Sequence, residues 1–337
     1  SFLIGVLVCR PEVNMLMTRD QVTADFGRVW DAAGLRNFYG QGWRHSWLLR
    51  LMGLDLSGST FVTKTTTANP KLGNTPLRAD LMAADLVPPS VHWQFWGCHT
   101  LNAWGLSGPG AEVVLDRLAE LCEQDRFKVL QISFMPVGLD REELLAETRQ
   151  FVQLLRTRLP RFQGVKLMVQ FNASCPNTGH NLSEFLRVLT EHLKILGDLG
   201  LPVMVKESVD TPFHGIRRAL EHPHCVGLVT TNSVKYGNLP DKIPWEQLFG
   251  SASPLKRLGG GGYSGPYLFP LVVERVKQYR ASGYTGHINA GGGMRTAAEA
   301  TALHAVGADS VFIGATCANY RPWNVAKIVA EARFWEP

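Results

Sequence analysis

The sequence predicts an α/β fold of the TIM (β/α)8 barrel class, with an N-terminal hairpin extension and an inserted active-site loop. From about residue 60 onward, short runs rich in β-branched residues alternate with segments whose apolar residues recur every three or four positions. This alternation is typical of βαβ units around a parallel sheet. No Gly/Ser-rich or Pro-rich linker divides the 337 residues, so we expect one domain over residues 1–337.

Eight strands are predicted from the apolar runs, and the first of them is weak. They are expected at residues 27–32, 60–66, 128–134, 165–171, 202–207, 226–231, 287–290 and 310–313. Amphipathic helices are expected between and after them, at residues 111–124, 141–157, 182–199, 213–221, 266–281, 297–306 and 324–334. Eight interleaved strands suit a closed barrel, although strand number alone leaves a doubly wound open sheet as the alternative.

Two segments lie outside this pattern. Residues 1–25 contain no clear βα unit, and we expect a hairpin there that plugs the floor of the barrel. Residues 86–110 are rich in Pro, Trp and Gly and are too long for an idle connection, so they are predicted to form an active-site loop. Because Ser1 is not an initiator methionine, a truncated or processed N-terminus is expected.

Composition argues against several classes of protein. The net charge of +5 is modest and its Lys and Arg are spread along the chain, which argues against nucleic-acid binding. No apolar run approaches the roughly 18 residues of a membrane helix, so no membrane association is expected. The six cysteines are far apart without a CxxC pair, which argues against a metal site or a disulfide framework and favours the reducing cytoplasm.

The stretch Phe171-Asn172-Ala173-Ser174-Cys175-Pro176-Asn177 ends a buried strand with a thiol between two carboxamides. Proline has no amide donor, so the sheet stops and Cys175 is presented in a loop. In α/β barrels the carboxyl ends of the strands carry the chemistry. Cys175 is therefore a candidate catalytic residue. The alternative is that it is a buried, inert cysteine.

Glycine clusters lie where barrels often bind phosphate. Residues 259–265 precede a predicted helix, residues 289–293 end the seventh strand, and Gly314-Ala315 ends the eighth. Glycines let backbone amides approach an anion without obstruction by a Cβ atom. Each cluster alone is commonly a tight turn, but three together predict a cofactor that carries phosphate.

Two lysines emerge from apolar strands, Lys64 and Lys206, where an ammonium group is costly unless it meets an anion or a ligand oxygen. The alternative is that each lysine extends to solvent at the barrel rim. Carboxamides at strand ends or in the long loop offer both donors and acceptors to a planar imide-like substrate. They are Asn102, Asn172, Asn177 and Asn232.

With these residues in view, the chain resembles a dihydroorotate dehydrogenase of the soluble type that uses cysteine as its base (class 1). The resemblance extends from about Phe26 to Ala318, and it rests on the order and spacing of several short motifs. Among these are Thr63-Lys64-Thr65-Thr66, Asn102-Ala103-Trp104-Gly105-Leu106, the run at residues 172–177, Thr231-Asn232-Ser233 and Ala290-Gly291-Gly292. The resemblance implies a barrel that binds FMN, a homodimer in the cytoplasm, and a role in pyrimidine biosynthesis.

Carried over by position, the resemblance assigns FMN binding to Ala33, Gly34, Lys64, Thr65, Asn172, Lys206, Thr231, Gly265, Gly291, Gly292, Gly314 and Ala315. It assigns dihydroorotate or orotate binding to Lys64, Asn102, Trp104, Gly105, Leu106, Asn172, Asn177, Asn232 and Ser233. Cys175 would accept the proton from C5 while a hydride passes from C6 to flavin N5. Lys64 would supply charge for the substrate carboxylate.

The sequence departs from the family at several points. Asp31 stands where asparagine is usual, Trp104 replaces a smaller methionine, and the segment between Gly34 and Lys64 is longer than usual. Three alternatives remain open on the residues. They are a flavin oxidoreductase for another dihydropyrimidine, a Schiff-base lyase using Lys206 or Lys64, and a silent barrel that only binds a phosphate ligand.

Overall fold

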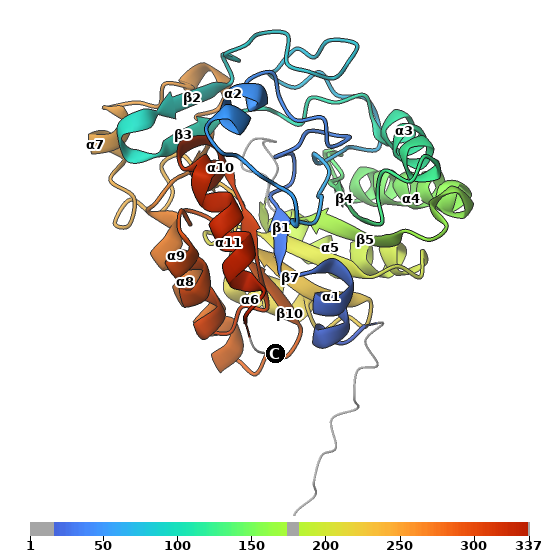
Figure 1. Cartoon of the computed structure of the whole chain (residues 1–337). Helices are drawn as coiled ribbons and strands as arrows, with labels where there is room; N and C mark the ends of the chain where they lie inside the picture. The colour runs from blue at the N-terminus through green and yellow to red at the C-terminus, as the bar shows by residue number, and fades with distance from the viewer. Residues whose placement is uncertain (1–16, 174–181, 336–337) are drawn as a thin grey trace, which may run out of the picture.

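A parallel sheet that curls into a barrel forms the centre of the molecule (Figure 1). The structure is a computed structural model that describes residues 17–173 and 182–335. Its seven regular parallel strands follow the order β1-β11-β10-β7-β6-β5-β4. Their bounds are β1 Val29–Asp31, β4 Val129–Phe134, β5 Lys166–Asn172, β6 Val203–Glu207, β7 Cys225–Thr230, β10 His287–Ala290 and β11 Ser310–Ile313.

The predicted strand at residues 60–66 closes the barrel between β1 and β4. Parallel bridges join Trp30 to Thr60 on one side and Val62 to Gln131 on the other. The amide of Thr60 donates to Val29 O, and the amide of Thr63 donates to Gln131 O. Both edges of the seven-stranded sheet are therefore paired, as a barrel requires. The barrel prediction is confirmed, and the doubly wound alternative is wrong.

Helices surround the barrel, and the predicted ones form with ends shifted by a few residues at most (Figure 1). Their bounds are α3 Ala111–Glu123, α4 Arg141–Arg158, α5 Leu182–Gly197, α6 Phe213–Ala219, α8 Leu268–Ala281, α9 Ala297–Ala305 and α11 Val325–Ala332. Local signals set some of these ends. Asp140 caps α4 by accepting from the Glu143 amide, and Thr296 with Glu299 forms a capping box on α9. Besides a helix in the N-terminal extension, the described residues contain three short α-helices that were not predicted: α2 Ser46–Leu51, α7 Trp245–Phe249 and α10 Ala315–Tyr320.

The N-terminal extension differs from its prediction, because its described part is a helix and not a hairpin. Helix α1 spans Arg19–Phe26 and begins with a capping box between Thr18 and Gln21. Its Val22 and Phe26 are buried against the apolar lower end of the barrel. The extension therefore covers the barrel floor, as expected, but through a helical apolar face.

Alternate residues of each strand point into the barrel, and these inward side chains change from apolar at the floor to polar toward the mouth. The floor is apolar and includes Trp30, Met168 and Met204. Residues two positions further along the strands are carboxamides, Gln131 on β4 and Gln170 on β5, and both are buried. The mouth carries Lys64, Ser133, Asn172 and Lys206. The two lysines are thus at the mouth of the barrel and not at its floor.

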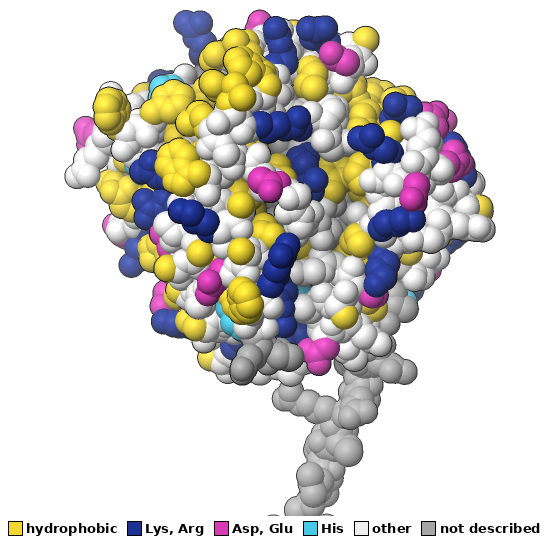
Figure 2. Space-filling view, viewed as in Figure 1, with side chains coloured by type: hydrophobic (Ala, Val, Ile, Leu, Met, Phe, Trp, Pro, Cys, Tyr) yellow, Lys and Arg dark blue, Asp and Glu magenta, His cyan; other side chains and the backbone are white. Residues whose placement is uncertain are grey.

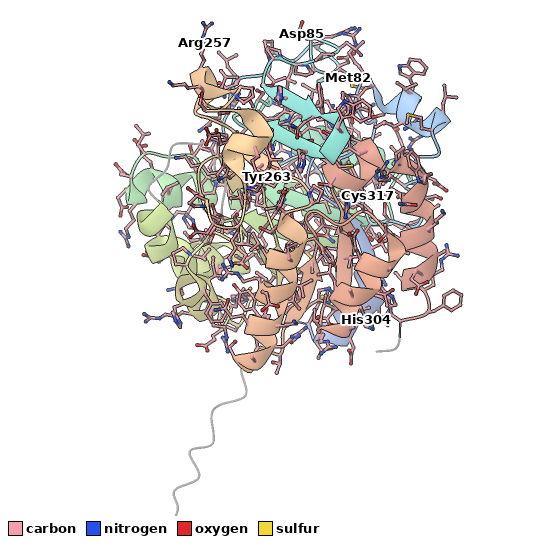
Figure 3. All side chains as sticks on the ribbon, turned by 90° about the vertical axis from the view of Figure 1, so that its left-hand side faces the viewer. Met82, Asp85, Arg257, Tyr263, His304 and Cys317 are labelled. Atoms are coloured by element: carbon pink, nitrogen blue, oxygen red, sulfur yellow. The ribbon has the colours of Figure 1, made fainter. Side chains whose placement is uncertain are left out.

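A second sheet covers part of the mouth, and it contains a hairpin within residues 86–110, which were predicted to be an active-site loop. There β2 Val91–Gln94 and β3 His99–Asn102 form a hairpin. β3 also pairs with β9 Gly262–Ser264, which pairs with β8 Val234–Lys235. Part of the glycine cluster at residues 259–265 is therefore a strand. Figure 3 shows Tyr263 of β9 below the β2–β3 hairpin, with His304 toward the opposite end of the molecule.

Candidate functional site

A cavity of about 760 Å³ opens at the mouth of the barrel, where the parallel strands end. This volume is in the range of small-molecule and cofactor sites. Most residues predicted to bind cofactor or substrate line this cavity. They are Ala33, Gly34, Lys64, Thr65, Asn102, Trp104, Gly105, Leu106, Asn172, Lys206, Thr231, Asn232, Ser233, Gly292, Gly314 and Ala315. Cys175 and Asn177 lie outside the described residues.

Two predicted cofactor residues, Gly265 and Gly291, are not part of the cavity wall. A Cβ atom on Gly291 would lie 2.7 Å from Phe312 O, and one on Gly265 would lie 2.2 Å from the Tyr263 hydroxyl. Both positions need glycine for close packing behind the wall. Gly292 does line the cavity, where a Cβ atom would lie 2.6 Å from Thr231 Cγ2. The glycines thus allow the β7 and β10 ends to approach each other.

Lys64 links the strand at residues 60–66 to the loop at residues 102–107. Its side chain is 7% exposed, and its Nζ donates to Ser107 O at 2.5 Å. The same ammonium group lies 4.9 Å from the centre of the Phe38 ring, which is a cation–π distance. Lys64 is therefore held in place as a positive charge beside the cavity.

Lys206 ends β6 and is 6% exposed. Its neighbour in register on β5 is Asn172, and its Nζ lies 5.9 Å from the centre of the Phe312 ring. Burying an ammonium group is costly without compensating negative charge or acceptors. Lys206 therefore adds a second positive charge to the wall that contains Lys64.

A chain of hydrogen bonds orients the carboxamides at the strand ends. Asn232 Nδ2 donates to Asn172 Oδ1 at 3.0 Å, and Asn172 Nδ2 reaches Thr65 Oγ1 at 3.4 Å. Thr65 in turn contacts Ser133 Oγ at 2.9 Å. Thr65, Ser133 and Asn172 come from three adjacent strand positions, and Asn232 follows β7, which is separated from β5 by β6. The network fixes which carboxamide atoms face the cavity, as a site for a planar polar ring requires.

The loop at residues 102–107 has a backbone that needs support. Gly105 has φ 68°, and a Cβ atom there would lie 3.1 Å from the Asn74 amide nitrogen. Leu106 has φ 60°, a left-handed conformation that costs a non-glycine residue about 1–2 kcal/mol. The Asn74 amide donates to Trp104 O at 2.9 Å, and Ser107 Oγ donates to the same oxygen at 3.1 Å. Contacts from neighbouring segments therefore impose the shape of this loop.

The long segment at residues 35–58 supplies cavity residues that the sequence did not assign to the site. Among these are Trp43, His45, Leu49 and Arg50. The length of the segment and its Trp and Arg content indicated that it was unusual. No sequence pattern indicated which of its side chains reach the cavity. Burial lowers the pKa of His45, which favours its neutral form.

Asp31, one of the departures from the family, anchors this segment and does not line the cavity. It is 1% exposed, pairs with Arg36, and accepts from Ser59 Oγ at 2.7 Å. Burial raises the pKa of Asp31, while the Arg36 charge and the hydrogen bonds lower it. Arg36 and Ser59 lie near the two ends of the segment. The buried carboxyl thus holds both ends of the inserted segment together.

The charge of the cavity wall suits a ligand that carries phosphate or carboxylate. Four lining side chains are cationic, Arg36, Arg50, Lys64 and Lys206, against one acidic side chain, Asp55. Together with the volume and the close approach of backbone at Gly292, this wall fits a phosphate-bearing cofactor with a planar ring. Among the described residues, no group of three His, Cys, Asp or Glu side chains is arranged to hold a metal ion. None of the described helices is long and apolar enough to cross a membrane.

Comparison with known proteins gives consistent similarities. Residues 48–333 match the model of a family described as dihydroorotate dehydrogenase. The catalytic subunit of dihydroorotate dehydrogenase B (NAD(+)) from Latilactobacillus sakei is 28% identical over 274 residues, covering 79% of this chain and 77% of that protein. Dihydroorotate dehydrogenase A (fumarate) from Lacticaseibacillus paracasei is 28% identical over 301 residues, covering 87% and 89%.

Solved structures resemble the chain in fold. A ligand-free dihydroorotate dehydrogenase from Eimeria tenella superposes with a TM-score of 0.64 at 20% identity. The match covers 91% of this chain and 83% of that one.

Proposed function

Because this chain belongs to the dihydroorotate dehydrogenase family, we propose that it oxidises dihydroorotate to orotate in pyrimidine biosynthesis with FMN as its cofactor. One observation supports this most directly. The buried ammonium groups of Lys64 and Lys206 share a cavity wall with the Asn172 and Asn232 carboxamides. Such a wall suits a flat, anionic, imide-bearing molecule.

We propose that FMN occupies the part of the cavity bounded by the ends of β1, β5, β6, β7, β10 and β11. The residues that would hold it are Ala33, Gly34, Lys64, Thr65, Asn172, Lys206, Thr231, Gly292, Gly314 and Ala315, with Gly265 and Gly291 packing behind them. When bound, FMN supplies the acceptor for the hydride that leaves C6 of the substrate. Lys206 would place a positive charge beside its ring, which stabilises negative charge that develops there.

The substrate would be held between the carboxamides and the loop at residues 102–107. Lys64 would bring positive charge to the substrate carboxylate, together with backbone amides of that loop, and is kept there by its contact with Ser107 O. Asn102, Asn172, Asn232 and Ser233 would bind the ring, with Asn177 as a further proposed contact. The side chains of Trp104 and Leu106 would enclose it.

The base in this proposal is Cys175, whose Sγ would accept the proton from C5 of the substrate. A thiol with an ordinary pKa of about 8.5 is mostly protonated at neutral pH, and the thiolate is the form that accepts a proton. Turnover is therefore expected to rise with pH until the thiol is ionised.

We also propose a homodimer located in the cytoplasm. The turn between β2 and β3 exposes two aromatic side chains, Phe95 at 71% and Trp96 at 102%, and this supports a surface that is covered by a second copy.

The experiment is an absorption spectrum of purified protein, followed by anaerobic addition of dihydroorotate. We expect a yellow protein whose flavin bleaches. Cys175→Ala should keep its flavin while the rate of bleaching collapses. Cys122→Ala, a buried cysteine on α3 that is not in the cavity wall, is the matched control and should bleach normally. A colourless protein that takes up no added FMN would refute the cofactor, and normal bleaching of Cys175→Ala would remove that residue from its role.

A further inference from the structure

Trp43 connects two walls of the cavity that are far apart in the sequence. Its indole Nε1 donates to Gly34 O at 2.8 Å, in the turn that follows β1. Its ring lies 4.7 Å from the ring of Trp104, centre to centre, with the planes tilted by 39°. Both tryptophans line the cavity. One side chain of the inserted segment therefore contacts the proposed cofactor turn and the proposed substrate loop at once.

The two rings touch each other directly and leave no space for a ligand between them. Carbon atoms in contact are about 3.5–4 Å apart, so a flat ring between two others would need a separation of about 7 Å. The observed 4.7 Å is that of a packed aromatic pair. Trp43 thus packs against Trp104 and does not form a sandwich around a ligand with it.

Support of Trp104 matters because the next two residues adopt left-handed backbone conformations, Gly105 at φ 68° and Leu106 at φ 60°. Asn74 and Ser107 hold this loop through the Trp104 carbonyl oxygen. Trp43 adds a contact to the Trp104 side chain from a different segment. The backbone and the side chain of Trp104 are therefore held by different segments of the chain. Trp104 directly precedes Gly105 and Leu106, whose amides belong to the proposed substrate loop.

We propose that Trp43 is a positioning residue that sets the affinity for substrate by holding Trp104, and with it the loop at residues 102–107. This inference rests on the proposed function, because that loop is where the substrate carboxylate would bind. In this proposal Trp43 acts through its contact with Trp104. Its loss therefore weakens substrate binding more than it slows the chemical step.

The test compares Trp43→Leu, Trp43→Phe and a matched control, Trp47→Leu. Trp47 belongs to the same segment but is 61% exposed and does not line the cavity. Bound flavin, kcat, the KM for dihydroorotate and the Kd of orotate by flavin difference spectra are measured for each. Trp43→Leu should raise KM and the orotate Kd about tenfold, equivalent to about 1.4 kcal/mol. Its flavin content should equal that of Trp43→Phe, which also lacks the hydrogen bond to Gly34 O, and kcat should change less than about twofold.

Trp43→Phe keeps a ring against Trp104 and should restore most of the affinity. A double-mutant cycle with Trp104→Leu gives the decisive result, because Trp43→Leu should have little further effect once Trp104 is gone. Additive effects, or a Trp43→Leu protein that binds orotate like Trp47→Leu, would overturn the proposal. A proportional loss of flavin, kcat and thermal stability would also overturn it, since that indicates a general structural role. If wild type neither oxidises dihydroorotate nor binds orotate, the proposed function fails and this inference fails with it.

Discussion

The native chain is expected to lose stability as pH rises because Glu207 ionises in a buried site. Replacing Glu207 by glutamine should prevent this loss. Glu207 follows Lys206 on β6, points outward against α8, and is fully buried. Arg275 Nε of α8 lies 3.7 Å from Glu207 Oε1. However, Arg275 Nη2 also donates to Val209 O at 2.6 Å and to Thr211 O at 2.8 Å. The cation is shared, so it offsets only part of the cost of burying the carboxylate.

Burial raises the pKa of Glu207 from 4.5 to about 7, while the charge of Arg275 acts in the opposite direction. The folded chain therefore binds the proton more tightly than the unfolded chain does. The resulting stabilisation is fully present below pH 4.5 and is lost as pH rises through about 7. A shift of this size corresponds to about 3 kcal/mol at full titration. Glutamine has the shape of the neutral acid and does not ionise, so the variant should not lose this amount.

The assay is the thermal unfolding midpoint of wild type and Glu207→Gln between pH 5 and pH 8. The difference between the two proteins is the useful quantity, because buried histidines change the stability of both. Burial lowers the pKa of His287 to about 4, which makes the folded chain more stable as pH rises toward 6.5, the opposite of Glu207. Glu207→Gln should gain on wild type steadily as pH rises.

Glu274→Gln is the control. Glu274 is next to Arg275 on α8, but its side chain is 71% exposed. It should show a difference from wild type that stays constant across the range. A Glu207→Gln difference that is equally flat, or that shrinks as pH rises, would refute the buried-carboxylate argument.

Two further predictions concern the cofactor and the assembly. Gly292→Ala would place a methyl group 2.6 Å from Thr231 Cγ2 at φ 121°, so we expect loss of most bound flavin, measured as the ratio of flavin to protein absorbance. Gly164→Ala, also at positive φ but with open space around it, is the control, and equal flavin in both variants would contradict the prediction. Trp96→Ser should convert the proposed dimer to a monomer in analytical ultracentrifugation, whereas Leu139→Ser, at a residue that is 91% exposed, should not. If the wild-type protein is already monomeric, the dimer proposal is wrong.

The barrel was predictable because a parallel sheet covered on both faces requires apolar runs, and β4, β5, β6 and β7 are such runs. The small sheet was not predictable in the same way. Its strands are short and mixed in polarity, as in His99–Asn102, and β3 pairs with β9 from a distant part of the chain. In the described part of the N-terminal extension, the helix at Arg19–Phe26 replaces the predicted hairpin, and the capping box of Thr18 and Gln21 is the local signal for its start.

The cavity residues at strand ends were predictable for a geometric reason. The carboxyl ends of parallel strands meet at one edge, so Lys64, Asn172 and Lys206 must lie near one another once the barrel is assigned. Loop residues follow no such rule. Gly292 is part of the cavity wall, whereas the adjacent Gly291 is not. Which of two neighbouring glycines lines a cavity depends on the backbone coordinates, which the sequence does not provide.

The departures from the family become connected in space. Asp31 pairs with Arg36 and Ser59 and so closes the base of the inserted segment. The segment then carries Trp43 to the cavity, where it packs on Trp104. The Trp104 side chain is supported at the cavity wall by the Trp43 ring, which the segment at residues 35–58 supplies. An asparagine at position 31 could not form the ion pair with Arg36, so the buried acid, the insertion and the two tryptophans act as one structural unit beside the site.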